Sequence, residues 1–185
     1  MFRENPASER CGSRIFFCGE ECYHSGGALW SKVGSCGKEW SRVFMGEFQH
    51  SLDDKARLTV PAKFREELGS AFVVTRGLDR CLFAYPRSDW EALEEKLRSL
   101  PLTRADARQF IRFFFSGATE CELDKQGRIV VPSNLREYAS ISRDCVVIGV
   151  GARVEIWDQE LWKSYTSDVG NRFGELAESL VDLDL

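Results

Sequence analysis

The chain has 185 residues, of which 43% are hydrophobic and 29% are charged, and its formal net charge is −4. This is an ordinary globular composition with room for one or two cores. No apolar run approaches the roughly 18 residues that a membrane helix needs, so we expect neither a membrane span nor a membrane partner. The acidic balance argues against a protein that coats nucleic acid without sequence preference, but it leaves room for a local basic patch.

Residues 1–42 differ from the rest of the chain, because Gly, Ser, Cys and scattered aromatic residues occur there without helical or strand period. The segment has no signal-peptide pattern, and its cysteine spacing matches no common zinc knuckle. We expect this extension to be non-native or disordered. Val43 is encoded by GTN and fits a GTG start codon, and Lys38-Glu39 fits a purine-rich ribosome-binding sequence upstream of it.

The alternating run 47–52 predicts a strand that leads into a fifteen-residue motif, Leu52 to Glu66. Its Asp-x-x-x-Arg run predicts a turn, because an Asp side chain bonds its own backbone there. The alternation at 57–60 then predicts a half-buried strand, and Pro61 favours the first turn of a short helix.

The next segments predict a hairpin and two helices. Ala71–Thr75 and Cys81–Tyr85 are apolar runs around a turn, as in paired strands. A helix is expected to open at Pro86 and Ser88, and a second is expected over 103–115 with a Thr cap.

The second half repeats the first. A strand over 118–123 leads into Leu123 to Glu137, which matches the first motif at seven of fifteen positions without a gap. Runs at 145–148 and 153–157 predict a second hairpin. Asp158 is expected to cap a last helix that loses its pattern after about Thr166, where an acidic tail begins.

Each half has about 45 residues, near the size below which a lone core is seldom stable. We therefore expect an α+β fold in which both halves pair into one pseudo-twofold β-barrel with flanking helices. The expected boundaries are an N-terminal extension (1–42), repeat 1 (47–89), connecting helices (90–117), repeat 2 (118–161) and a helix end with an acidic tail (162–185).

Five stretches of the chain carry a family resemblance: Met45-Gly46-Glu47-Phe48, Asp53-x-Lys55-x-Arg57-Leu58-x-Val60-Pro61, Ser116-Gly117-Ala118, Asp124-x-x-Gly127-Arg128 and Glu155-Ile156-Trp157-Asp158. With these motifs the chain resembles an MraZ-type transcriptional regulator with two SpoVT-AbrB-type DNA-binding repeats, over roughly 43–165. It departs at Ala56, where the family usually has Gly. If that turn needs a positive φ, Ala costs about 1 kcal/mol and reshapes the turn slightly.

The resemblance implies a swapped-hairpin, AbrB-like β-barrel and a ring of identical subunits. It also implies a cytoplasmic, nucleoid-associated protein that binds double-stranded DNA. The expected targets are direct repeats upstream of the division and cell-wall gene cluster, including the regulator's own promoter.

The candidate DNA contacts are basic residues in or near the two motifs, and the turn-orienting residues are the acids and the glycine beside them. The DNA-binding set is Arg57, Lys55, Arg128, Lys125, Lys63 and Arg65, and the orienting set is Asp53, Asp124 and Gly127. A second interpretation makes each Asp–Arg pair only a turn-stabilising contact, and the two interpretations are compatible. Cys81, Cys121 and Cys145 lie in apolar runs and are expected to be buried free thiols.

An alternative function is an antitoxin-like member of the same superfamily, which binds a protein partner through its C-terminal tail. An enzyme is not expected, because the sequence shows no nucleophile–base pair, metal-ligand cluster or phosphate loop. We therefore expect no catalytic residue, no metal, no cofactor and no small-molecule substrate.

Overall fold

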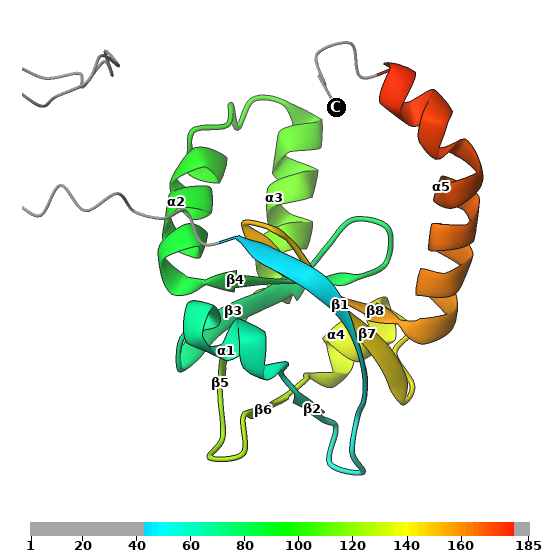
Figure 1. The fold of residues 1–185 in the computed structure, drawn as a ribbon. Coiled ribbons are helices and arrows are strands. Elements are labelled where there is room, and N and C mark those ends of the chain that lie inside the picture. The colour runs from blue at the N-terminus through cyan, green and yellow to red at the C-terminus, as the bar shows by residue number, and fades with distance from the viewer. Residues whose placement is uncertain (1–42, 180–185) are drawn as a thin grey trace, which may run out of the picture. The chain divides into compact units, whose positions relative to one another are not determined.

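The computed structural model describes residues 43–179, so the expectations for 1–42 and for the last residues of the tail lie outside the described residues. The elements in chain order are β1 (Phe44–Ser51), β2 (Arg57–Thr59), α1 (Ala62–Leu68), β3 (Ala71–Arg76), β4 (Leu82–Pro86), α2 (Arg87–Arg98), α3 (Ala105–Gly117), β5 (Thr119–Glu122), β6 (Arg128–Val130), α4 (Ser133–Tyr138), β7 (Asp144–Gly151), β8 (Arg153–Asp158) and α5 (Gln159–Ser179) (Figure 1). Each motif forms the predicted turn, strand and short helix.

The strands form two antiparallel sheets in which the repeats are interleaved. The larger sheet has the order β1-β7-β8-β4-β3-β5, and β2 pairs with β6 in a two-stranded ribbon. The outer pairings exchange the halves, because β1 of the first half joins β7 of the second while β5 of the second joins β3 of the first. The α+β class and the two paired repeats are confirmed. Closure into a barrel stays a prediction.

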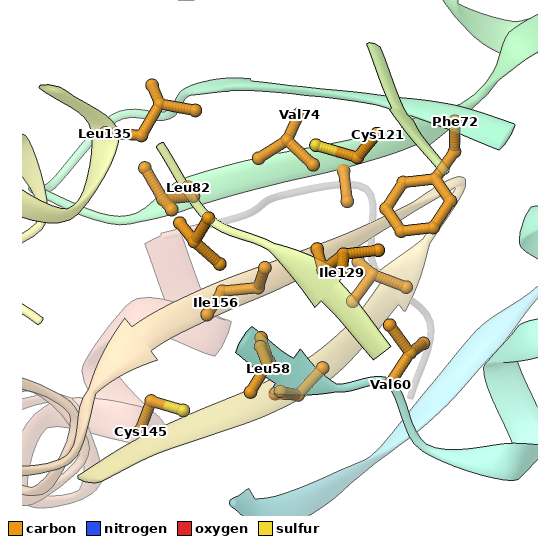
Figure 2. Packing of buried hydrophobic residues seen from close by; sticks show 14 of the residues in the cluster. Leu58, Val60, Phe72, Val74, Leu82, Cys121, Ile129, Leu135, Cys145 and Ile156 are labelled. Carbon is orange, nitrogen blue, oxygen red and sulfur yellow. The ribbon is translucent and has the colours of Figure 1, made fainter. Parts of the chain in front are cut away.

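The main core lies between the ribbon, the sheet and the two short helices. Leu58 and Ile129 point into it from the ribbon, and each is 1% exposed. Phe64 from α1 and Leu135 from α4 are buried in the same cluster. Figure 2 shows both ribbon residues among side chains of the sheet. Burial of these apolar groups on one side of the ribbon leaves its other side outward.

The three cysteines of the described region are free and buried, as predicted. Burial raises the pKa of the Cys121 thiol to about 11. Burial, with the nearby charge of Asp144, raises that of Cys145 to about 12. Burial raises the pKa of Cys81 even further. Because the thiolate is the reactive form, these residues serve as packing groups.

The longer helices cover the sheet through aromatic side chains. Trp90 of α2 stacks on Phe114 of α3 with ring centroids 5.7 Å apart. Trp157 of β8 is 3% exposed and lies 5.3 Å, between ring centroids, from Trp162 of α5. These tryptophans are therefore packing residues. Within residues 43–179, no helix is both long and apolar enough to cross a membrane.

Two predicted helix boundaries are wrong. Helix α3 begins at Ala105 with Arg104 as its N-cap residue, so Thr103 is not the cap. Instead the side chain of Arg108 turns back, and its Nη1 donates to the carbonyls of Leu102 (2.7 Å) and Thr103 (2.9 Å). The loop before the helix is thus held by a cation from the helix itself.

Helix α5 runs on to Ser179, well beyond the predicted loss of pattern near Thr166. Tyr165, Val169 and Phe173 follow one another at i, i+4 spacing, which continues an apolar stripe along the helix. The Asp158 cap is confirmed, because its Oδ1 accepts from the backbone N–H of Glu160 at 3.1 Å.

Candidate nucleic-acid interface

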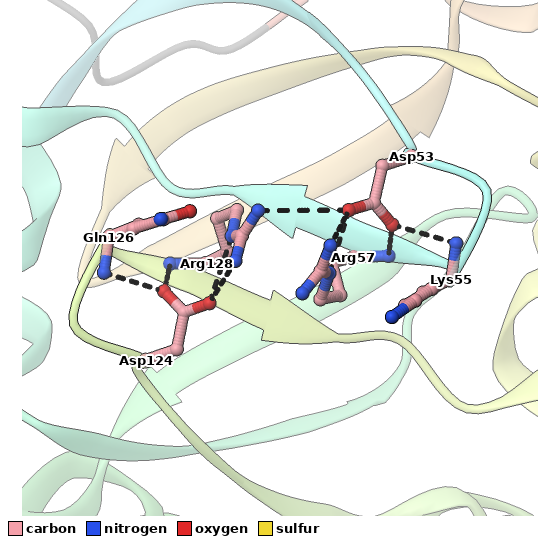
Figure 3. A network of polar contacts seen from close by, with 6 residues as sticks. All are labelled: Asp53, Lys55, Arg57, Asp124, Gln126 and Arg128. Carbon is pink, nitrogen blue, oxygen red and sulfur yellow. Dashed lines mark hydrogen bonds and ion pairs between the residues drawn. The ribbon is translucent and has the colours of Figure 1, made fainter.

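The β2–β6 ribbon presents four side chains outward. In its register Arg57 lies opposite Val130, Leu58 opposite Ile129, and Thr59 opposite Arg128. Successive residues of a strand point to opposite faces, so the burial of the central pair turns the other four side chains outward. Figure 3 shows both arginines on this ribbon with the turn residues that hold them.

The first turn is built around the carboxylate of Asp53. Its Oδ1 accepts from the backbone N–H groups of Lys55 and Arg57, both at 2.9 Å. Its Oδ2 accepts from Nε of Arg57 at 2.7 Å and lies 2.6 Å from Nη2 of the same residue. The backbone closes the turn, because the N–H of Ala56 donates to the carbonyl of Asp53 at 2.9 Å.

The second turn repeats this arrangement around Asp124. Its Oδ1 accepts from the backbone N–H groups of Gln126 (2.8 Å) and Arg128 (2.9 Å). Its Oδ2 accepts from Nε of Arg128 at 2.9 Å and from Nη2 at 2.7 Å. In both repeats one Asp therefore fixes the turn and orients the Arg that opens the following strand.

Both turns use a left-handed backbone residue before the arginine. Gly127 has φ of +74°, and Ala56 has φ of +56°. The turn does require a positive φ, and Ala56 adopts it although an L side chain is disfavoured there. The expected reshaping of the first turn is therefore wrong, since its hydrogen bonds repeat those of the second.

The Asp–Arg contacts set the charge of the site. The hydrogen bond from the Arg57 side chain, with those from backbone N–H groups, lowers the pKa of the Asp53 carboxyl to about 2. The equivalent bonds from Arg128 lower the pKa of Asp124 to about 2. The bond to Asp53 in turn raises the pKa of Arg57. Both carboxylates are therefore ionised at neutral pH.

The two arginines meet near the first aspartate. Nη1 of Arg128 lies 3.8 Å from Oδ2 of Asp53, the oxygen that also binds Arg57. The side chains of Arg57 and Arg128 keep 29% and 22% of their surface exposed. The structure thus brings together both predicted arginines, which lie on the ribbon, and both predicted acids, which lie in the turns beside it.

The four other predicted cations divide into two groups. Lys55 and Lys125 are exposed in the turns beside the ribbon, as the prediction requires. Nζ of Lys63 donates instead to the carbonyl of Met45 on β1, at 3.0 Å. Nε of Arg65 donates to the carbonyl of Val60 at 2.7 Å. The last two are held by backbone groups within the fold.

Arg65 is part of a repeated brace. Its guanidinium lies against Gly127, so close that a Cβ there would overlap it. The equivalent residue of the second repeat, Arg136, donates from Nε to the carbonyl of Val131 at 3.2 Å. In each repeat this hydrogen bond connects the short helix to the residue before the proline, which is Val60 or Val131.

Sequence reasoning missed Thr59 and Val130 as members of the outer face. Their outward position could have been predicted from strand alternation, because Thr59 follows the buried Leu58 and Val130 follows the buried Ile129. A metal site was not expected, and residues 43–179 contain no group of three or more His, Cys, Asp or Glu residues placed to hold one.

The arrangement suits an anionic, hydrogen-bonding partner. A two-stranded ribbon fits the major groove of B-form DNA, and an oriented guanidinium matches either the O6/N7 edge of guanine or a phosphate. Since Arg57 gives Nε and one Nη to Asp53, further N–H donors of its five remain for such a partner.

Comparison with known proteins finds one family model and several relatives that are named alike. The family model described as "MraZ protein, putative antitoxin-like" matches the chain twice, over residues 43–113 and 114–183. A protein of Syntrophomonas wolfei subsp. wolfei is 60% identical over 143 residues, which cover 77% of this chain and 100% of the relative. A protein of Moorella thermoacetica is 59% identical over 143 residues with the same coverage. One of Desulforamulus reducens is 62% identical over 141 residues, 76% of this chain and 99% of the relative. All three are named "Transcriptional regulator MraZ".

Proposed function

The chain belongs to the MraZ family of transcriptional regulators, and from that membership we propose that it binds specific DNA sequences through its β2–β6 ribbon. The family agrees with the resemblance drawn from the sequence and with the expectation of a protein that is not an enzyme. The observation that carries the proposal is the pair Arg57 and Arg128, which face outward from one ribbon and are oriented by carboxylates.

In this proposal the aspartates preorganise the arginines. Each carboxylate fixes its Arg before DNA arrives, so less side-chain entropy is lost when the Arg contacts a base. Lys55 and Lys125 lie in the turns at the ribbon ends and contact phosphates, which position the ribbon without reading sequence. Lys63 and Arg65 keep their backbone partners, so we assign them a structural role.

We also propose that this chain binds the DNA targets that the family resemblance implies. It acts in the cytoplasm, on the nucleoid, at direct repeats upstream of the division and cell-wall gene cluster and of its own gene. A single ribbon holds few base contacts, so one copy has limited affinity. Binding of linked copies to spaced repeats raises affinity through effective concentration.

Assembly into a ring is supported by two exposed apolar surfaces at different places on the chain. Leu78, Phe110 and Phe113 are 62%, 43% and 51% exposed, and they line a largely apolar cavity of about 210 Å³. On α5, Phe173 is 64% exposed and Leu176 is 37% exposed. When one surface of a copy meets a different surface of the next, the contacts propagate and close into a ring if the rotation allows.

The test is binding to duplexes that the wild-type protein enriches from a random-sequence pool. Affinity for the enriched duplex and for an unrelated duplex is compared in wild type, Arg57→Ala and Arg128→Ala. Arg98→Ala is the matched control, because Arg98 is an exposed arginine on α2 rather than on the ribbon. We expect each ribbon variant to lose at least tenfold in specific affinity while the control keeps it. Equal effects of all three variants, or no enrichment by wild type, would refute DNA reading by the ribbon.

A second candidate is an antitoxin-like protein that binds a protein partner through α5. It is favoured by the exposed apolar residues of α5 and by the acidic residues around them, such as Glu175 and Glu178. The variant Phe173→Asp separates the candidates. The antitoxin-like function predicts loss of a protein partner with DNA binding unchanged, whereas the regulator with a ring predicts smaller assemblies and weaker DNA binding.

A further inference from the structure

Two outward ribbon residues, Thr59 and Val130, are not arginines, and on the proposed function they too face the DNA. We propose that Val130 recognises the methyl group of a thymine within two base steps of the guanine that Arg57 contacts. Thr59, at the equivalent place in the other half, accepts several bases. The ribbon is pseudo-twofold in its backbone but asymmetric in what it reads, so each copy binds DNA in one orientation.

The register gives each arginine a different neighbour. Arg57 lies directly opposite Val130, and Arg128 lies directly opposite Thr59. Thr59 and Val130 occupy equivalent positions of the two repeats. The outer face therefore consists of two corresponding halves, one with an Arg beside a Val and the other with an Arg beside a Thr.

The exposure of Val130 is unusual for its place in the fold. Val130 is 60% exposed, whereas the neighbouring apolar residues Ile129 and Val131 are 1% and 2% exposed. A single exposed apolar residue needs no explanation by itself. Here the residue lies beside an oriented arginine on the face that the proposed function turns toward DNA, so it has a place in the reading surface.

The chemistry of the major groove suggests what this residue meets. In unmodified DNA the C5-methyl group of thymine is the apolar feature of that groove, and small apolar side chains contact it. Residues opposite one another in a ribbon have Cβ atoms about 5 Å apart, and base pairs rise by about 3.4 Å. A base read by Val130 is therefore within one or two steps of the guanine read by Arg57.

The side chain of Thr59 differs from that of Val130 because it carries a hydroxyl group. Its hydroxyl donates or accepts a hydrogen bond, and its methyl group still tolerates thymine. Thr59 beside Arg128 can satisfy several bases, so that half of the site is less strict. Lys55 and its equivalent Gln126 also differ in charge, which strengthens the contrast between the two ends of the ribbon.

The test replaces thymine by uracil, which removes only the methyl group, at one position at a time in the duplex that wild type enriches. For wild type we expect one sensitive thymine, within two base steps of a guanine, whose replacement weakens binding about fourfold, as loss of one buried methyl group implies. The sensitivity becomes weaker in Val130→Ala, because two methyl groups that reach toward the base are removed. Thr59→Ala is the matched control and leaves it unchanged.

An exchange variant tests the orientation. In the double variant Thr59→Val, Val130→Thr, the sensitive thymine moves to the corresponding place in the other half of the site. Neither side chain is buried, so we expect the variant to fold, and thermal unfolding checks this. A uracil response identical in all variants, or an enriched site without a methyl-sensitive thymine, would overturn the role of Val130 alone. If wild type enriches no sequence, the proposed function itself is refuted.

Discussion

Arg128 approaches the aspartate of the other repeat, with its Nη1 3.8 Å from Oδ2 of Asp53. The same oxygen accepts a hydrogen bond from Nε of Arg57 at 2.7 Å. Asp53 therefore links the guanidinium groups of both repeats, whereas the hydrogen bonds to Asp124 come from its own turn. The two turns have matching hydrogen bonds, but only Asp53 of the first turn contacts the arginines of both repeats.

This relationship predicts a difference between two conservative variants. Asp53→Asn keeps an oxygen for the backbone N–H bonds of the turn but removes the charge that holds both arginines. We expect the ratio of specific to non-specific DNA affinity to fall about tenfold or more, while non-specific affinity rises because one negative charge is gone. Asp124→Asn should have the smaller effect on the ratio. Equilibrium binding to enriched and unrelated duplexes measures both, and equal effects would contradict the coupling.

The positive φ of Ala56 predicts a stabilising variant. Ala56→Gly relieves a left-handed conformation that disfavours an L side chain, so we expect the free energy of unfolding to rise by about 1 kcal/mol. Chemical denaturation of wild type and variant measures this. The DNA-reading surface is unchanged, so specific affinity should stay the same.

The opposite substitution, from Gly to Ala, can be made at Gly127, which is the equivalent position of the second repeat. Gly127→Ala introduces the strain and also pushes the Arg65 guanidinium away from its contact, so its cost should exceed the gain at Ala56. In an Arg65→Met background the cost should shrink, because only the backbone strain remains. A cost that is the same in both backgrounds would show that Arg65 does not brace this turn.

The lowered pKa values of Asp53 and Asp124 predict an acid-sensitive contribution to stability. A carboxyl with a folded-state pKa of about 2 and an ordinary value near 3.8 stabilises the fold fully above about pH 4, and this contribution is lost as the pH falls toward 2. Urea unfolding between pH 2 and 5 should show a shallower pH dependence in the variant Asp53→Asn, Asp124→Asn than in wild type. Parallel curves would mean that the two carboxyls do not titrate with folding.

The exposed apolar cavity residues predict the effect of one loop substitution on assembly. Leu78→Asp places a charge in the cluster with Phe110 and Phe113, so light scattering should find smaller assemblies. Affinity for duplexes with several repeats should fall by at least tenfold, and affinity for one repeat should not. Leu102→Asp is the control, because Leu102 is 65% exposed but outside the cavity lining. Equal masses for both variants would place the contacts elsewhere.

Sequence patterns predicted the local structure best within the repeat, because each element could be recognised in two copies. The Asp-x-x-x-Arg turn, the strand and the proline-led helix were each visible twice, and the structure forms them all. The α5 boundary was missed because Val169 and Phe173 are separated by Gly-Asn-Arg, which includes a residue that is unfavourable in helices. Helical spacing continues there although composition turns acidic.

Tertiary contacts account for what local patterns did not predict. Arg65 was predicted as a DNA contact on a short helix, and the structure adds two partners that the sequence did not predict: the carbonyl of Val60, just after β2, and Gly127 of the other repeat. Nothing in the local sequence encodes that contact. The Thr103 cap failed for a similar reason, since the side chain of Arg108 holds the loop.

If Arg57 and Arg128 read bases, a variant that keeps their charge but removes the planar geometry of the guanidinium should lose sequence preference. In the double variant Arg57→Lys, Arg128→Lys, binding is measured at several salt concentrations with enriched and unrelated duplexes. We expect unrelated DNA to be bound with the wild-type salt dependence, because each phosphate contact contributes a slope of about −0.9 and no charge is lost. Preference for the enriched duplex should fall at least tenfold, because lysine lacks the planar fork. An unchanged preference would contradict base reading by this ribbon.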